Sequence, residues 1–90
     1  MSVEDQLELF PVAVHLHRVD PDRNMRRFYR LALQPDLFGG CTLVREWGRI
    51  GSGGRVRLDT YESEGQAVDA LAVLAKVRTR RGYAPPGRSE

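Results

Sequence analysis

Hydrophobic and polar residues alternate along the first two thirds of the chain, with the period of two that is typical of β-strands. In one such segment, Tyr29, Leu31 and Leu33 share a face, while Phe28 and Arg30 lie on the other, mixed face. We therefore expect antiparallel strands with one apolar face and one face that can meet a ligand. The predicted strands are residues 12–17, 25–34, 41–47 and 55–60.

Turn-forming residues separate these segments. Residues 19–24 contain Asp-Pro-Asp, Pro35 precedes the pair Gly39 and Gly40, and four glycines lie within residues 48–54. Such residues predict that the chain reverses direction at each position, as antiparallel pairing requires.

The last third of the chain changes to a helical period. Apolar residues recur at helical spacing over residues 64–81, and Ser63 with Gln66 three positions later matches a capping box. Gly82 suits the C-terminal cap. The predicted fold is a single α+β domain in which an antiparallel β-sheet packs against one C-terminal amphipathic α-helix.

A chain of 90 residues is long enough for one domain with a modest core. We expect a flexible acidic lead-in over residues 1–11, the domain over 12–84 and a flexible tail over 85–90. The sequence has no apolar run long enough to cross a membrane, and its acidic start is unlike a secretory signal, so we expect a cytoplasmic protein without membrane contact. Cys41 is the only cysteine, which excludes an intrachain disulfide and zinc sites that need several thiolates.

The net charge of +2 conceals blocks of opposite sign along the chain. Residues 23–58 carry eight arginines against two acids, and residues 76–90 carry five bases against one acid. The flanking blocks, residues 1–22 and 59–75, each sum to −4. Of the 14 basic residues 13 are arginine, whose planar fork suits phosphate, although codon usage in a GC-rich genome would also favour arginine.

The third predicted strand leads directly into a Trp-Gly-Arg motif. Strand alternation places Arg45 and Trp47 on a common face, and Arg49 joins them if the extended backbone continues. Residues two apart on a strand are separated by roughly 6.6 Å, so the two guanidiniums would flank the indole at a spacing near that of successive nucleotides. The arrangement favours a sugar or base stacked between phosphates.

The same residues can also have purely structural roles. The only tryptophan of a small domain is commonly a core residue, and the glycines near Trp47 can simply form a hairpin loop. Arg55 and Arg57 can form a solvated strand face. Whether Trp47 faces the predicted helix or points away from it decides between these interpretations.

Several short motifs, taken in order, resemble the WGR domain, which is named for its Trp-Gly-Arg. The resemblance covers about residues 12–84 and implies an antiparallel sheet with one helix. It rests on Arg27-Phe28-Tyr29, on Pro35-Asp36-Leu37-Phe38-Gly39-Gly40, on Leu43-Val44-Arg45-Glu46-Trp47-Gly48-Arg49-Ile50-Gly51 and on Arg80-Arg81-Gly82-Tyr83.

In the DNA-dependent poly(ADP-ribose) polymerases, the WGR domain contacts DNA near a strand break and relays that contact to a separate catalytic domain. The resemblance implies that Trp47 stacks on a terminal nucleotide, that Arg49 contacts the partner and that Gly48 allows close approach. Arg45 is added from strand alternation alone. The 90 residues leave no room for a catalytic domain, so we do not expect ADP-ribosyl transfer.

Other residue types that can carry chemistry lack the partners that they need. His15 and His17 share a strand face, but the sequence nominates no third ligand, so we expect no metal and no cofactor. No serine or cysteine lies in a nucleophile motif and no paired carboxylates share a face, so we expect no catalytic residues. The basic segment of residues 76–83 is either a clamp or the ordinary charge of a helix C-terminus.

The leading hypothesis is a monomeric nucleic-acid-binding module for DNA, rather than RNA, that takes ends or nicks with low sequence specificity. The alternative is a module that docks a protein partner, such as a DNA-repair enzyme, through the same surface. The residues predicted to bind nucleic acid are Trp47, Gly48, Arg49, Arg45, Arg30, Arg55, Arg57, Arg80, Arg81 and Tyr83.

Overall fold

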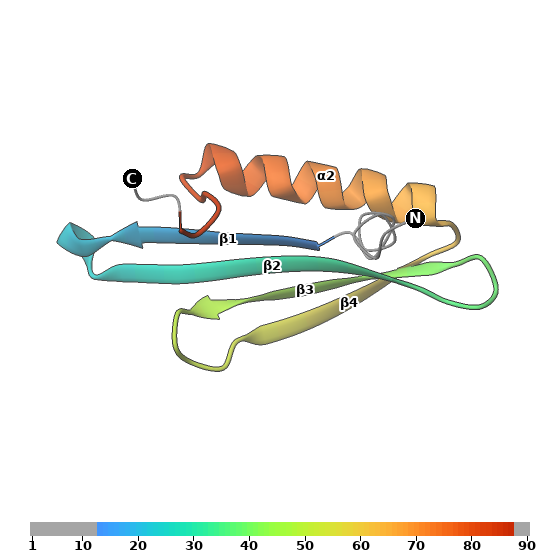
Figure 1. Ribbon diagram of the computed structural model, residues 1–90, viewed down its shortest axis with the longest axis horizontal. Coiled ribbons are helices and arrows are strands. Elements are labelled where there is room, and N and C mark those ends of the chain that lie inside the picture. The colour runs from blue at the N-terminus through green and yellow to red at the C-terminus, as the bar shows by residue number, and fades with distance from the viewer. Residues whose placement is uncertain (1–12, 88–90) are drawn as a thin grey trace, which may run out of the picture.

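The computed structural model describes residues 13–87, which form four strands, a short 3-10 helix and one α-helix (Figure 1). Each strand pairs antiparallel with the next along the chain, and the α-helix lies along one face of the sheet. This arrangement confirms the predicted α+β class. In chain order, the elements are β1 (Ala13–Asp20), η1 (Pro21–Arg23), β2 (Met25–Pro35), β3 (Cys41–Arg49), β4 (Arg55–Tyr61) and α2 (Glu64–Arg80).

The first turn is shorter than predicted. β1 continues through Val19 and Asp20, which pair with Arg26 and Met25 of β2, so only residues 21–24 reverse the chain. Asn24 closes the reversal in the left-handed conformation, with φ 52°, a conformation that asparagine tolerates better than most residues. The predicted turn over residues 19–24 was therefore too long by two strand residues.

The third strand is longer than predicted and reaches Arg49. The extended backbone thus continues through the Trp-Gly-Arg motif, and Trp47 and Arg49, which are two residues apart on the strand, lie on the same face. β4 and the helix differ from the predicted ranges by one residue each.

Side chains from the sheet face beneath α2 form the core. Tyr29, Leu31 and Leu33 of β2 are each 1% exposed, which confirms the face that alternation predicted. The free thiol of Cys41 is also buried, and burial raises the pKa of this thiol. The remaining buried members of the core are Leu16, Leu43, Ala67, Leu71 and Tyr83.

The helix is fixed at both ends as the sequence predicted, with one difference. The Ser63 hydroxyl accepts a hydrogen bond from the backbone N–H of Gln66 at 3.2 Å. The Gln66 side chain accepts from the backbone N–H of Glu62, at 3.1 Å, one residue before the cap. Gly82 follows the helix with φ +97°, the left-handed conformation that glycine adopts without strain.

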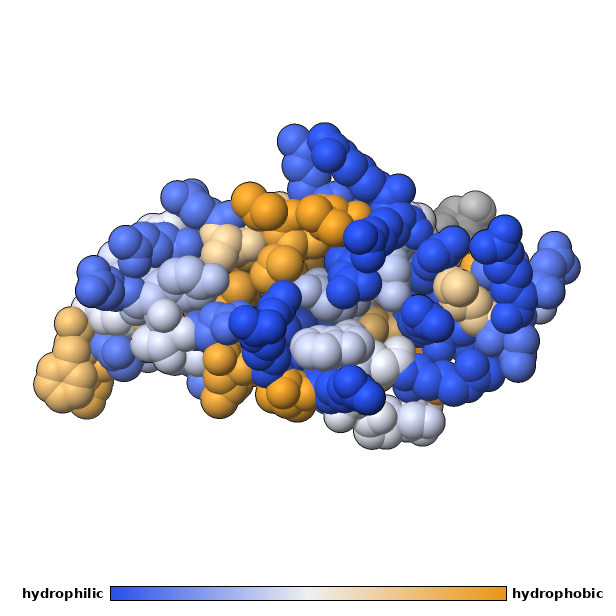
Figure 2. Space-filling view, turned by 180° about the vertical axis from the view of Figure 1, so that it is seen from behind, coloured by the Kyte–Doolittle hydropathy of each residue, from blue (hydrophilic) through white to orange (hydrophobic). Residues whose placement is uncertain are grey.

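The two ends of the sheet differ in surface chemistry. The β2–β3 loop exposes Leu37 and Phe38 almost fully, at 96% and 93%. Figure 2 shows this hydrophobic tip at one end of the molecule and mainly hydrophilic side chains at the other end, where the β1–β2 and β3–β4 turns lie.

Within residues 13–87, no helix has the length and apolar character needed to span a membrane. The predicted lead-in, residues 1–11, lies outside the described residues.

Candidate nucleic-acid interface

Strand register builds two rows of side chains at the turn end of the helix-covered face. Arg27 of β2 is paired with Arg18 of β1 on one side and with Arg49 of β3 on the other, so three arginines lie abreast on adjacent strands. The next row toward the middle of the sheet contains Tyr29 and its β3 partner Trp47. The register therefore places basic side chains directly beside aromatic ones.

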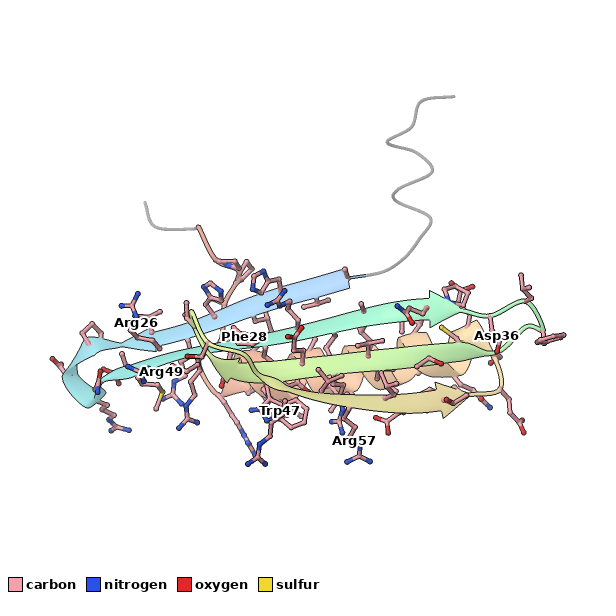
Figure 3. All side chains as sticks on the ribbon, turned by 90° about the horizontal axis from the view of Figure 1, so that it is seen from below. Arg26, Phe28, Asp36, Trp47, Arg49 and Arg57 are labelled. Atoms are coloured by element: carbon pink, nitrogen blue, oxygen red, sulfur yellow. The ribbon has the colours of Figure 1, made fainter. Side chains whose placement is uncertain are left out.

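A cleft of about 480 Å³ opens at this end of the molecule. Two strands and the end of the helix contribute to it, because α2 terminates here and delivers Arg78, while the residues after the helix deliver Tyr83. Figure 3 shows Arg26, Phe28 and Arg49 near the end of the sheet with the β1–β2 and β3–β4 turns, and Asp36 at the opposite end. The cleft is lined by Arg27, Phe28, Trp47, Gly48, Arg49, Arg78 and Tyr83.

Trp47 has a structural and a surface role at once. Its face is the one that α2 covers, and it packs against the buried core with its ring centroid 6.4 Å from that of Tyr29. It is nevertheless only partly buried, and it lines the cleft. The indole thus forms a cleft wall that the core holds in place.

Arg78 is held by aromatic rings. Its guanidinium carbon lies 4.2 Å from the ring centroid of Tyr29 and 5.6 Å from that of Tyr83. A cation over an aromatic face is attracted by the ring quadrupole, and the helix C-terminus favours positive charge at the same place. Tyr83 itself is only 7% exposed, so it acts here as a core residue that positions Arg78.

Arg49 is oriented by the first turn. Its two terminal nitrogens donate to the backbone oxygen and the side-chain oxygen of Asn24, both at 3.3 Å. The side chain remains exposed. These bonds limit the conformations of Arg49 without neutralising its charge.

Two glycines near the motif, Gly48 and Gly54, are explained by close packing within the β3–β4 hairpin and against Phe28. A Cβ on Gly48 would lie 2.9 Å from the Cα of Gly54, and a Cβ on Gly54 would lie 2.7 Å from Cζ of Phe28 and closer still to the backbone oxygen of Trp47. Gly53, between them, has open space. Gly48 thus allows the chain's own backbone to approach closely, and close approach of a ligand at Gly48 stays a prediction.

Three other arginines predicted to bind nucleic acid are each in an ion pair. Arg45 and Arg57 both pair with Asp59, at 3.4 and 3.1 Å. Arg30 lies on the opposite face of the sheet, where it pairs with Glu46 at 3.8 Å and its guanidinium carbon lies 4.9 Å from the Phe28 ring centroid. The predicted arginines are therefore divided between the two faces of the sheet.

Besides Arg49, three predicted arginines are in no ion pair within residues 13–87. Arg55 is exposed and is the register partner of Trp47, next to the cleft. Arg80 and Arg81 are exposed at the end of the helix.

Sequence reasoning missed Arg27 and Arg78 as cleft residues. Arg27 was recoverable, because it lies two residues before Tyr29 on the strand and therefore on the face of Trp47. Arg78 belongs to the basic segment of residues 76–83, for which a clamp was one of two interpretations, but no residue spacing singled it out, since its position depends on where the helix ends over the sheet.

His15 and His17 lie against each other. Their Nε2 atoms are 3.1 Å apart and their rings meet edge to face. No group of three or more metal-ligating side chains occurs in the part of the chain that the structure describes. Burial, with smaller contributions from His17 and Arg30, lowers the pKa of His15 below its ordinary value of 6.5.

The fold and the cleft define a small α+β module that presents an arginine-rich, aromatic-walled cleft beside the end of its helix. The model of the WGR domain matches residues 12–90, and the chain belongs to the WGR domain family. WGR domains are in general nucleic-acid-binding modules and are not catalytic.

A curated relative has no established function. The chain is 39% identical over 85 residues to the uncharacterized protein y4dW of Sinorhizobium fredii (strain NBRC 101917 / NGR234). The alignment covers 94% of this chain and 42% of the relative, so the chain spans less than half the length of that protein. No solved structure is a significant match.

Proposed function

We propose that the cleft binds nucleic acid, with DNA ends or nicks as its ligands and with low sequence specificity. The observation that supports this function best is the set of three arginines around Trp47. Arg27, Arg49 and Arg78 line the cleft, and within residues 13–87 none of them is paired with a carboxylate. Guanidiniums without anionic partners are suited to phosphate oxygens.

The position of Trp47 favours an end or nick over intact duplex. Part of the indole is packed against the core, so only a cleft-facing part can contact a ligand. In an intact duplex the bases already stack on one another, whereas a terminal nucleotide offers a free sugar or base face. Contacts to phosphate and sugar carry no direct sequence information.

A polarisation titration at two salt concentrations tests this proposal. The ligands are nicked 5′-phosphorylated duplex, intact duplex, single-stranded DNA and RNA. We expect the nicked duplex to bind most tightly, with log affinity falling linearly against log salt, and to quench the fluorescence of Trp47, the only tryptophan. Binding to none of these ligands would instead favour docking of a protein partner.

The variants must separate stacking from folding, because Trp47 also packs against the core. We expect Trp47→Leu, which keeps apolar bulk but has no aromatic face, to weaken binding to nicked duplex about tenfold or more. Trp47→Phe should retain most of the affinity. Far-UV circular dichroism and thermal unfolding verify that both variants fold, and equal affinity of folded Trp47→Leu and the parent would contradict the proposal.

A further inference from the structure

The two edge strands of the sheet differ in their backbone hydrogen bonding. The outer edge of β1 is closed near its middle by Ala84, which exchanges two backbone hydrogen bonds with His17, at 2.8 and 2.9 Å. The outer edge of β4 faces no other strand within residues 13–87, since β4 ends the sheet order. Within the described part of the chain, one edge is thus capped at His17 and the other is paired with no strand.

β4 lacks two of the features that usually prevent edge pairing, a proline and a bulge, but it carries inward-pointing charge at Arg57 and Asp59. Natural proteins interrupt exposed edges with proline, bulges or inward-pointing charge. β4 contains no proline or glycine, and it pairs with β3 in continuous register over seven residues. Its open-face residues Val56 and Leu58 are 59% and 63% exposed. A regular strand with exposed apolar side chains is suited to accept another strand.

The charges of β4 have a self-complementary order. Arg57 and Asp59 lie on either side of Leu58 and share the helix-covered face. In an antiparallel pair of identical strands centred on Leu58, each Arg57 lies opposite Asp59 of the partner subunit. Opposite charges directly across a pair of strands stabilise it, and like charges destabilise it.

We propose that a second copy of this chain pairs with the β4 edge, antiparallel and centred on Leu58, to form a two-fold dimer with a continuous eight-stranded sheet. This proposal differs from the monomer expected from the sequence. Paired residues share a face of the sheet, so both helices lie on one side and the two clefts open on the same side.

Neighbouring registers are less favourable. Centring the pair on Arg57 places two like charges opposite each other at the axis, and centring it on Asp59 does the same with carboxylates. Centring it on Val56 places Arg55 opposite Arg57 of the partner subunit on both sides of the axis. Among these registers, only the one centred on Leu58 has two attractive pairs and no repulsive one.

Sedimentation equilibrium tests the association, and cysteine cross-linking tests the register. We expect the mass to rise with concentration from 10.2 kDa toward twice that value. Under mild oxidation, Leu58→Cys should form a disulfide-linked dimer, whereas Val56→Cys and Thr60→Cys alone should not. A mixture of the latter two variants should cross-link, because those positions are opposite each other in this register. Cys41 is fully buried, which keeps it out of the reaction.

Two charge reversals provide a matched pair. Arg57→Asp should weaken dimerisation at least about tenfold, because the two-fold axis turns both attractive pairs into repulsive ones. Arg55→Asp makes the same charge change on the same strand, opposite Tyr61 of the partner subunit, and should have a smaller effect. A mass that stays at one chain at all concentrations, or cross-linking of Val56→Cys as fast as that of Leu58→Cys, would overturn the proposal. Neither outcome depends on whether the cleft binds nucleic acid.

Discussion

Two groups of arginines in this domain differ in their neighbours. Those of the first group, which we call the paired arginines, each lie within 4.0 Å of a carboxylate. They are Arg23, Arg30, Arg45 and Arg57. Those of the second group, the cleft arginines, line the cleft without a carboxylate partner in residues 13–87. They are Arg27, Arg49 and Arg78.

Position along the strands separates the two groups on the helix-covered face. In the middle of the sheet, Asp59 of β4 reaches both Arg45 and Arg57. Toward the turns, the partners available to Arg49 and Arg78 are an amide and aromatic rings, which orient a guanidinium but leave its charge uncompensated. The same residue type therefore stabilises the fold in one place and is available to an anion in the other.

The largest expected effect comes from removing cleft arginines. Replacing Arg27 and Arg49 together by alanine should weaken binding to nicked duplex on the order of a hundredfold, because each loses a charged hydrogen bond to phosphate. The slope of log affinity against log salt should become shallower by about two. Polarisation titrations measure both quantities.

The control for this prediction is the double variant Arg23→Ala/Arg30→Ala, which has the same net charge but loses only paired arginines. We expect it to weaken binding several-fold at most. Equal losses in the two double variants would show that net charge alone, and not position in the cleft, governs affinity.

An intermediate effect is expected when a paired arginine loses its carboxylate. Asp59→Asn leaves Arg45, whose side chain is 17% exposed, without a countercharge. We expect the free energy of unfolding to fall by about 1–2 kcal/mol, less than for a fully buried pair because solvent screens part of the interaction. Urea unfolding measures the change.

Glu46→Gln is the matched variant, since it makes the same charge change beside Arg30, whose side chain is 51% exposed. Glu46→Gln should lower the free energy of unfolding by less than about 0.5 kcal/mol. If the two variants lose the same free energy of unfolding, burial does not determine how much each ion pair contributes to stability.

The fold was predictable because its signals are local. Alternation assigned Tyr29, Leu31 and Leu33 to the buried face, and Ser63 and Gly82 marked the ends of the helix. The length of the first turn was not predictable in this way, because Val19 and Asp20 are held in the strand by their partners across the hairpin.

The cleft was only partly predictable, because it depends on contacts between distant segments. Alternation correctly grouped Arg45 with Trp47, but it did not identify which carboxylate would reach Arg45. It also did not show that α2 covers the face of Trp47 and ends near the cleft, bringing Arg78 there. Residue spacing determines which face of a strand a side chain occupies. Ion pairs depend in addition on which strands become neighbours in the sheet.

The prediction with the smallest expected effect concerns how far an ion pair neutralises the charge of an arginine. Although Arg30 pairs with Glu46, its charge is one of the causes that lower the pKa of His15. Arg30→Gln should therefore raise the pKa of His15 toward 6.5, as measured by NMR titration of the imidazole proton. Arg27→Gln, which removes the same charge from the other face of the sheet, should leave that pKa unchanged.

The same change has a defined consequence for stability. A pKa of His15 that is lower in the folded state than in the unfolded state means that folding favours the neutral ring. Its contribution to stability is present above pH 6.5 and is lost as the pH falls through the unfolded and then the folded pKa. Arg30→Gln should make this acid-side loss smaller in urea unfolding experiments between neutral pH and pH about 5. An unchanged pKa of His15 would mean that Glu46 fully screens Arg30, and that the paired arginines exert no field beyond their partners.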